Sequence, residues 1–460
     1  MRGAKMNFFS KKARLNLVAK VLILTSVFGI GSYIIIPSTA VVAYADSTVI
    51  KSNKELIKNK IFTGLQSYKT EITFTADEVK NFGIVKDTET DPASIYYDLL
   101  FEHPEIFWTS LKITWVKYDD GSYILFINNL YENSDIDSKK LQLQDKINEI
   151  TNKVSSYDEL RKVYEIHDYI NKNCTYDVEG YKKSMPSSKI DPNIDFDAYI
   201  ADDRAVAKAN ANYFESHSIY GVLVKGKAVC EGYAKTAKIL FNKSNIESEV
   251  IRSNEHGWNS VKINGNYYQI DTTWDDYKDE ATIYPYSYFN ITKDQMEKDK
   301  DNKETYTAIS GNVPNTTEVT FDNIFRNVKD DTLKWKNVVR VDNKLYGIEP
   351  NGSKYNFYSC NLDGTNKTVI KANIYDADNA YAYNNKIYYF EYGLKNNELY
   401  MDINKYDTLT GKTIQSLDFL SEFGQPKGDF FVSFYIKDNM MHVTLKDDNG
   451  EVTKNYQVLV

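Results

Sequence analysis

Cysteine is scarce in this chain, with three residues in 460: Cys174, Cys230 and Cys360. At most one pair can form, so the sequence excludes the disulfide framework of small secreted domains and leaves at least one thiol over. No histidine pair and no Cys/His set has the spacing of zinc ligands, and no glycine-rich phosphate loop is present. We therefore expect neither a metal ion nor a cofactor.

Apolar runs long enough to span a membrane are absent after residue 45. Before it, six basic residues precede an uncharged segment from Val21 to Ala45, whose apolar part, Val21 to Ile36, has the length of a signal-peptide core. The segment ends in an A-x-A pattern at Ala43-Tyr44-Ala45. We expect a signal peptide over residues 1–45, cleaved after Ala45, and a secreted or cell-surface protein. The alternative is an uncleaved N-terminal anchor.

Acidic residues outnumber basic ones once the expected signal peptide, residues 1–45, is removed. The remaining chain has 50 basic against 64 acidic residues, a net charge near −14. This charge argues against nucleic acid or an anionic membrane surface as the main partner. With 42% hydrophobic and 26% charged residues, the chain can bury sizeable cores, and its length indicates two or three domains.

The chain changes character along its length. Residues 46–160 mix helical spacing with a hairpin signal at Asp119-Asp120-Gly121 and predict an N-terminal α/β region. Helical spacing continues from Asp137 to Asn173. Residues 177–212 are polar and weakly periodic, which predicts a long connection that either contains short helices or is disordered.

Residues 311–460 have short Tyr-rich segments between Asn/Asp/Gly turns and predict an all-β domain. Weak repeats occur at VDNKLYGI (341–348), YNNKIYYF (383–390) and KDNMMHVTL (437–445). Their spacings of 42 and 54 residues are typical of propeller blades. Three units are too few for a closed propeller, so an open β-domain is an equal alternative.

The stretch GKAVCEGYAKTAKILF (226–241) predicts a helix that begins at Cys230. Val222, Val224 and Val229 upstream suggest an extended approach to it. A thiolate at the positive end of a helix is stabilised, so Cys230 is a candidate nucleophile. A small buried packing residue is the alternative interpretation.

The stretch NEHGWNSVKINGNYYQIDTTWDD (254–276) predicts a hairpin around Asn264-Gly265. With these two residues as the loop, His256 and Asp271 fall on one sheet face as diagonal neighbours, roughly 7–8 Å apart and within side-chain reach. A three-residue loop would place them on opposite faces. Alone, His256 could be a packing residue and Asp271 a strand-end cap.

A nucleophilic thiol needs a base, and the base needs a third group that fixes its tautomer. Cys230, His256 and Asp271 supply this set. His217 could also serve Cys230, but the sequence places no carboxylate beside it at a defined register. His167 and Cys174 are expected to be packing or surface residues.

The motifs GKAVCEGYA, HGWNSVKING and YYQIDTTWDD closely resemble the transglutaminase-like superfamily, in its bacterial exported branch. The resemblance covers roughly residues 160–300. It implies a papain-like α+β core, with the cysteine on a helix N-terminus and the histidine and aspartate on an antiparallel sheet. It also implies roles for Cys230 as nucleophile, His256 as general acid/base and Asp271 as the orienting carboxylate. Trp258, Asn259 and Trp274 match the motifs as structural residues, and the second oxyanion-hole donor is open, with Tyr220 a guess.

These observations together predict an α+β protein with a signal peptide (1–45), an N-terminal α/β region (46–160), a transglutaminase-like catalytic domain (161–310) and a β-repeat domain (311–460). The expected activity is cysteine-dependent hydrolysis of peptide or isopeptide bonds in a protein or peptide substrate, cell-wall material included. Amine transfer by a protein or cell-wall transglutaminase is one alternative. A catalytically silent surface binding or scaffold protein is the other.

Overall fold

The computed structural model describes residues 47–184, 196–253, 256–276, 285–299, 307–308, 311, 313–326, 336–424, 430–447 and 452–460. The expected signal peptide lies outside these residues. The chain divides into two compact units, which we describe separately. The first comprises Met1–Ser155, Asp168–Asn259 and Lys303–Val313, and the second Ser156–His167, Ser260–Asn302 and Pro314–Val460. The domain boundaries expected from the sequence stay a prediction.

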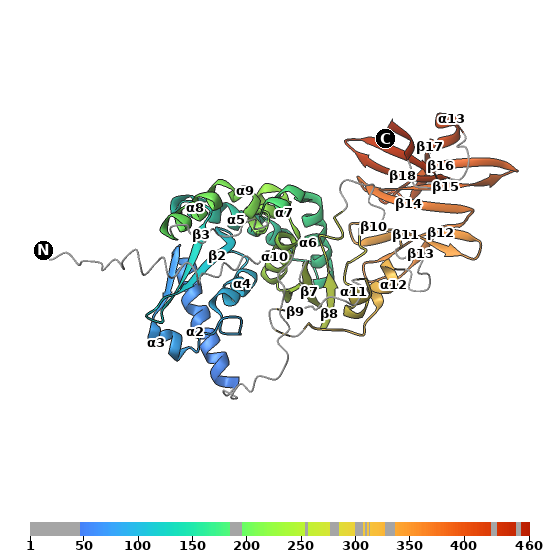
Figure 1. The fold of residues 1–460 in the computed structure, drawn as a ribbon. Helices are drawn as coiled ribbons and strands as arrows, with labels where there is room; N and C mark the ends of the chain where they lie inside the picture. The colour runs from blue at the N-terminus through green and yellow to red at the C-terminus, as the bar shows by residue number, and fades with distance from the viewer. Residues whose placement is uncertain are drawn as a thin grey trace. The chain divides into compact units, whose positions relative to one another are not determined.

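The first unit begins with a small sheet and the helices packed around it (Figure 1). Its helices are α2 (Ser47–Gln66), α3 (Ala76–Asn81) and α4 (Pro92–Glu102), and its strands are β1 (Glu71–Phe74), β2 (Thr109–Lys117) and β3 (Tyr123–Asn129). The strands are antiparallel in the order β1-β3-β2. The hairpin expected at Asp119-Asp120-Gly121 is confirmed, since it joins β2 to β3 and Gly121 has φ 87°.

Helices make up most of the remainder of the first unit. They are α5 (Asn133–Val154), α7 (Val178–Ser184), α8 (Phe196–Ala209), α9 (Ala211–Glu215), the π-helix η1 (Gly221–Lys225) and α10 (Cys230–Lys243). The expected helical stretch from Asp137 to Asn173 is two helices, because α5 ends at Val154 and α6 (Glu159–Asn173) begins after a break. The polar connection (177–212) contains helices, which is one of the two alternatives expected from the sequence. Residues 185–195 lie outside the described part.

The approach to α10 differs from expectation. Val222 and Val224 lie in the π-helix η1, and only β5 (Lys227–Ala228) is extended. Here the strand preference of valine does not decide the backbone conformation. Gly221, at the start of η1, is closely packed, since a Cβ there would be 2.5 Å from the Glu215 carbonyl oxygen. β5 pairs in parallel with β4 (Thr175–Tyr176). The prediction of an extended approach was therefore wrong for Val222 and Val224.

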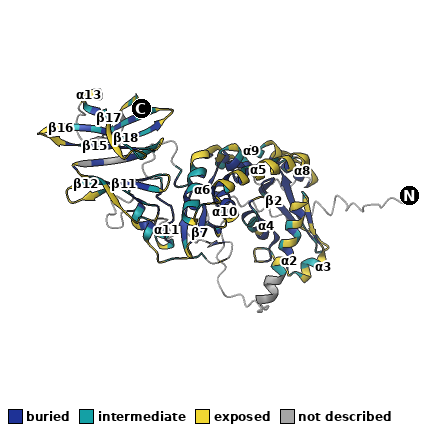
Figure 2. Ribbon diagram, turned by 180° about the vertical axis from the view of Figure 1, so that it is seen from behind, coloured by how far each residue is buried: buried dark blue, intermediate teal, exposed yellow. Residues whose placement is uncertain are grey.

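A four-stranded sheet in the order β8-β7-β6-β9 follows α10. Its strands are β6 (Ser248–Arg252), β7 (Gly257–Ile263), β8 (Asn266–Ile270) and β9 (Thr307–Ala308). Asn264 and Gly265 join β7 to β8 with φ angles of 50° and 87°. Positive φ at both residues is the requirement of a type I′ turn, so the two-residue loop expected from the sequence is confirmed. Among the helices that the structure describes, α10 is well enclosed, and eleven of its 14 residues are buried (Figure 2).

The second unit carries α11 (Lys293–Asp299), α12 (Thr320–Phe325) and three antiparallel sheets. In the first sheet are β10 (Val338–Val341), β11 (Lys344–Asn351), β12 (Lys354–Asn361) and β13 (Thr368–Ile374). The next contains β14 (Asp376–Tyr383), β15 (Lys386–Lys395), β16 (Glu398–Asp407) and β17 (Lys412–Asp418), followed by α13 (Phe419–Phe423). The last contains β18 (Phe430–Lys437), β19 (Met440–Asp447) and β20 (Val452–Leu459).

The three sequence repeats correspond to the first hairpin of each sheet. Their turns lie at Asp342, at Asn384-Asn385 and at Asp438-Asn439, where these residues have positive φ. Consecutive sheets meet through their first strands, β10 with β14 and β14 with β18. Apolar residues between the sheets, among them Phe357, Tyr389, Phe390 and Phe434, form two buried clusters. The mixture of helices and antiparallel sheets confirms the expected α+β class with a β-rich C-terminal part.

Candidate active site

Cys230 is the first residue of α10, as the sequence predicts. Val229 at the cap position has an extended backbone (φ −100°, ψ 173°) and provides no side-chain hydrogen bond to the first turn. The first N–H groups of a helix otherwise lack intrahelical partners, so a thiolate here would lie beside uncapped donors. The Cys230 residue is 4% exposed, and Cys174 and Cys360 are buried thiols as well.

The residues before Cys230 are held against neighbouring strands. Parallel pairing of β4 with β5 sets Tyr176 opposite Ala228, two residues before the cysteine. Tyr176 is 38% exposed, and partial burial together with the nearby Cys230 raises the pKa of its hydroxyl. The Val229 N–H donates to the Ser216 carbonyl oxygen at 2.9 Å. An exposed aromatic side chain therefore flanks the thiol.

The first turn of α10 is packed so closely that Gly232 has no room for a side chain. A Cβ at this position would lie 2.5 Å from the Ser216 carbonyl oxygen and 3.1 Å from that of Ser218. Tyr220, the guessed oxyanion donor, has its hydroxyl hydrogen-bonded to Gln142 (3.0 Å) and Lys139 (3.2 Å) on α5. These contacts indicate a structural role for the Tyr220 side chain.

His256 lies directly before β7 and is partly exposed. Its backbone N–H donates to Ser253 Oγ (3.1 Å), and its carbonyl accepts from the Ser253 N–H (2.9 Å). Its imidazole stacks on the indole of Trp258, with ring centroids 6.0 Å apart and an interplanar angle of 20°. Trp258 is buried, so it gives the imidazole a fixed wall.

Asn259 connects the strand that follows His256 with the helix that begins at Cys230. Its Nδ2 donates to the Ala234 carbonyl oxygen at 2.9 Å, and Ala234 lies one helical turn after the cysteine. A Cβ on Gly257, the residue after His256, would be 4.0 Å from the Ala234 Cβ. The start of β7 therefore packs against the first turns of α10.

Asp271 follows β8 and is fully buried. Its Oδ1 accepts from the backbone N–H groups of Thr273 and Trp274, both at 3.0 Å, and its own N–H donates to the Tyr288 carbonyl oxygen at 3.0 Å. The carboxylate thus caps the turn that follows the strand. The expected pairing of Asp271 with His256 stays a prediction.

A histidine on α6 pairs with an aspartate of the YYQIDTTWDD motif, and the sequence did not reveal this pair. His167 Nε2 and Asp275 Oδ2 are hydrogen-bonded at 3.0 Å, and both residues are buried. The other oxygen of Asp275 accepts from the Tyr288 N–H at 2.8 Å. Burial raises the pKa of Asp275 to about 6 against the opposing effect of His167. No local pattern could have predicted a contact between residues 108 positions apart.

His217 has a carboxylate partner, which corrects the expectation that it lacks one. Its Nδ1 is 3.0 Å from Glu231 Oε2, and Glu231 is the residue after Cys230. The sequence could not predict this pair, because His217 lies in a loop and Glu231 on a helix, so no strand register relates them. His217 and Glu231 are both buried, whereas His256 is partly exposed. His256 is therefore the more accessible of the two histidines.

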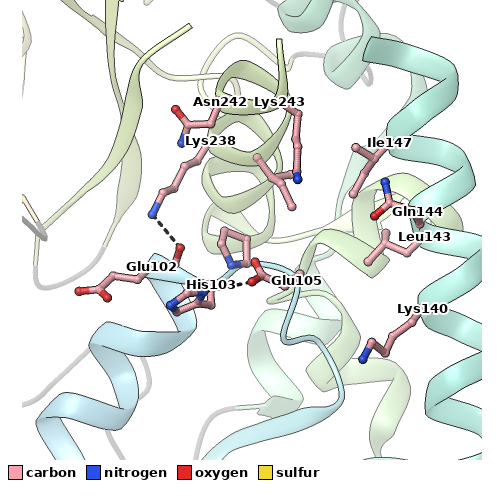
Figure 3. Close-up of a pocket in the computed structure, with 12 residues that line it drawn as sticks. Glu102, His103, Glu105, Lys140, Leu143, Gln144, Ile147, Lys238, Asn242 and Lys243 are labelled. Atoms are coloured by element: carbon pink, nitrogen blue, oxygen red, sulfur yellow. Dashed lines mark hydrogen bonds and ion pairs between the residues drawn. The ribbon is translucent and has the colours of Figure 1, made fainter. Parts of the chain in front are cut away.

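A cavity lies at the other end of α10. It has a volume of about 510 Å³ and is lined by Lys238, Asn242 and Lys243 together with Glu102–Glu105 and part of α5 (Figure 3). At 1.5 Å per helical residue, Lys238 to Lys243 lie about 12–20 Å from Cys230. This cavity is therefore distinct from the cysteine site.

Within the described part of the chain, no cluster of three or more His, Cys, Asp or Glu side chains could hold a metal ion. Among the described helices, none combines the length and the apolar character needed to cross a membrane.

Comparisons with known proteins identify the central region. Residues 145–302 match the family model described as a transglutaminase-like domain. A solved structure described as a TGase is 18% identical over 36% of this chain and 44% of its own, with a TM-score of 0.22. A second, described as a "putative protease" from Parabacteroides distasonis, is 11% identical over 65% of this chain and 55% of its own, with a TM-score of 0.21. A comparison with curated proteins found no match.

The chain spans about half the length of the two solved structures it matches. The TM-scores of these two alignments are too low to support a family resemblance. The resemblance therefore depends on the match over residues 145–302. That match confirms the resemblance expected from the motifs around Cys230, His256 and Asp271.

Proposed function

We propose that this chain, whose residues 145–302 form a transglutaminase-like domain, is an exported cysteine-dependent acyl-transfer enzyme that hydrolyses peptide or isopeptide bonds. Cys230 is the proposed nucleophile, His256 the general acid/base and Asp271 the group that orients the imidazole. One observation carries the proposal: Cys230 begins a helix without a side-chain cap, and Asn259 fastens that helix to the strand that follows His256.

The proposed reaction proceeds through a thioester. His256 takes the thiol proton, the sulfur of Cys230 bonds to the substrate carbonyl carbon, and the carbonyl oxygen becomes an oxyanion. The Cys230 backbone N–H, uncapped at the helix start, is a donor for that oxyanion. The C–N bond then breaks, and the leaving amine takes the proton from His256. Water, deprotonated by His256, attacks the thioester and releases the carboxylic acid and the thiol.

Hydrolysis is preferred over amine transfer because the proposed base is open to water. His256 is partly exposed, so water competes with any amine for the thioester. Transfer to a protein or cell-wall amine is the alternative outcome of the same chemistry. A silent scaffold would keep the fold without the reaction.

Alkylation by iodoacetamide between pH 4 and 9, with the labelled peptide identified by mass spectrometry, tests the nucleophile. An activated Cys230 should react well below the pH range of an unperturbed thiol, about 8.5. A Cys230 that reacts only above about pH 8 would contradict the proposal.

A peptide library, incubated with and without a primary amine, separates the remaining alternatives. A hydrolase releases carboxylic acid in both conditions, and a transferase yields amide when the amine is added. The Cys230→Ala variant should abolish either product. No product from the native chain would favour the scaffold, and equal product from the variant would contradict Cys230 as the nucleophile.

A further inference from the structure

Three buried ionisable side chains lie together beside the proposed nucleophile, and the proposed reaction uses none of them. They are His217, Glu231 and Lys235, all of them buried. We call them the buried cluster. Glu231 follows Cys230 directly, and Lys235 lies one turn further along α10.

Contacts within the buried cluster occupy both oxygens of the carboxylate. Glu231 Oε2 is hydrogen-bonded to His217 Nδ1 at 3.0 Å, and Oε1 accepts from Lys235 Nζ. Lys235 Nζ also donates to the His217 carbonyl oxygen at 3.3 Å, and it lies 4.6 Å from the centroid of the Phe101 ring. The carboxylate therefore has a partner for each oxygen and a cation beside it.

Compared with apolar side chains in the same place, a buried ion pair of this kind is a poor source of stability. The cost of removing two charges from water offsets most of their attraction, and well-packed apolar residues often stabilise a core as much. Apolar side chains would suit this position, since Phe101, Ala234 and Val250 form an apolar cluster nearby. The charges at this place therefore call for an explanation other than folding energy.

The position of the buried cluster beside Cys230 supplies such an explanation. Glu231 puts a negative charge in the first turn of the helix, where the thiolate of Cys230 would also form. Two anions in one low-dielectric region repel each other, whereas the ammonium of Lys235 attracts both. The balance between Glu231 and Lys235 therefore acts on the charge state of the neighbouring thiol.

We propose that the buried cluster is a positioning and charge-balancing device for Cys230: it fixes the first turns of α10, and its net charge sets the pH at which the thiolate forms. This inference rests on the proposed function, because it takes Cys230 as the nucleophile. Glu231, Lys235 and His217 act through Cys230 and do not touch the substrate.

Other charged groups also face this region. On the strands and helices packed against α10 these include Tyr96, Tyr176, Asp177, Lys227 and Arg252, with Lys238 further along the helix and His256 as the proposed base. Asp177 and Lys227 form an ion pair at 3.1 Å. Substitutions within the buried cluster leave all of these groups in place, so a difference between variants reports the cluster.

The test is the pH profile of Cys230 alkylation by iodoacetamide in the full chain. Glu231→Gln removes the buried anion and should shift the midpoint to lower pH by about half a unit or more. Lys235→Gln removes the buried cation and should shift it to higher pH by a similar amount. Lys235→Arg retains the charge and should return the midpoint to within about 0.3 units of the native value.

Two matched controls lie at the far end of α10. Glu105 pairs with His103 at 3.1 Å on the surface, so Glu105→Gln removes the same charge from the same kind of pair. Lys243 is exposed at the last position of the helix, so Lys243→Gln matches Lys235→Gln. Neither control should move the midpoint.

Shifts in opposite directions support the inference, because a purely structural role would not reverse sign with charge. Shifts in one direction, or none, overturn it. If Glu231→Gln does not fold, Lys235→Gln decides alone: an upward shift supports the inference and any other result overturns it. A native Cys230 that reacts only above about pH 8 contradicts the proposed function instead, so the two failures are distinguishable.

Discussion

Glu231 combines complete burial with a strongly acidic carboxyl group. Burial alone would raise the pKa of Glu231, but Lys235 and His217 hold it at about 2. Because the folded pKa lies below the ordinary value of 4.5, the ionised form stabilises the fold above pH 4.5. This contribution is lost as the pH falls from 4.5 to 2.

The expected result is a loss of about 3 kcal/mol in the free energy of unfolding between pH 5 and 2 from this group. Glu231→Gln should remove that part of the pH dependence, whatever it does to the absolute stability. Urea unfolding at pH 6, 4 and 3 measures the slope. An unchanged slope in the variant would contradict the assignment.

The pKa of Asp275 is shifted in the direction opposite to that of Glu231. Burial raises the pKa of its carboxyl group from 3.8 to about 6, so the folded state binds a proton that the unfolded state releases. Stability from this group is complete below pH 3.8 and declines as the pH rises through 6.

Asp275→Asn should therefore reduce the decline in stability between pH 4 and 6, by about 2–3 kcal/mol. The amide oxygen can still accept from the Tyr288 N–H, which limits the structural change. Asp294→Asn, on the exposed side of α11, is the control. A decline that persists in Asp275→Asn would show that another group causes it.

At the level of elements, the junction of α10 and β7 depends on one amide. Asn259→Ala removes the donor to the Ala234 and Glu249 carbonyl oxygens, at a cost of about 1–3 kcal/mol. It should also slow Cys230 alkylation, because the helix start loses its fastening to the strand that follows His256. Asn242→Ala, which breaks contacts between the far end of α10 and Ser248, should lower stability without slowing alkylation. Equal alkylation in both variants would refute the link.

Packing of the first turn of α10 leads to a further prediction. Glycine to alanine normally stabilises a helix by about 1 kcal/mol, yet a Cβ on Gly232 would meet the Ser216 carbonyl oxygen at 2.5 Å. Gly232→Ala should therefore destabilise the chain by about 1–3 kcal/mol in urea unfolding. Gly257→Ala, whose Cβ would meet nothing closer than 3.8 Å, should change stability by less than about 1 kcal/mol. A neutral Gly232→Ala would show that the helix start can shift.

Local chemistry made some elements predictable from sequence. The turn at Asn264-Gly265 requires positive φ at both positions, and the Asn-Gly pair is typical of such a turn. The helix start at Cys230 followed from apolar spacing. Val222 and Val224 led to a wrong prediction, because β-branched residues favour strands, whereas these two residues lie in the π-helix η1. The pairs His167–Asp275 and His217–Glu231 depend on how separate elements meet, which no local pattern encodes.

On the scale of the whole molecule, three thiols in one chain should differ in reactivity. Burial raises the pKa of the Cys360 thiol to about 11, and Cys174 lies buried directly after α6. Native protein at pH 7.5 should therefore be alkylated at Cys230 first, and all three should react in urea. Peptide mapping at several times distinguishes the sites. Faster labelling of Cys174 or Cys360 in the native state would contradict this order.

The repeats in the C-terminal region were visible in sequence because each begins with the same kind of Asn/Asp turn, at Asp342, Asn384-Asn385 and Asp438-Asn439. How many strands complete each sheet was not predictable, since turn residues mark the ends of strands and not their partners. The sheets β10–β13 and β14–β17 each have four strands, and β18–β20 has three.

The two-residue turn between β7 and β8 also has an evolutionary meaning. Side chains alternate between the faces of a strand, so one residue inserted at Asn264-Gly265 would transfer every side chain of β8 to the opposite face. Descendants of this sequence can therefore lengthen the turn only in steps that restore the alternation. Related chains should differ here by even numbers of residues, or should carry a compensating bulge, and an alignment of homologues would test this rule of inheritance.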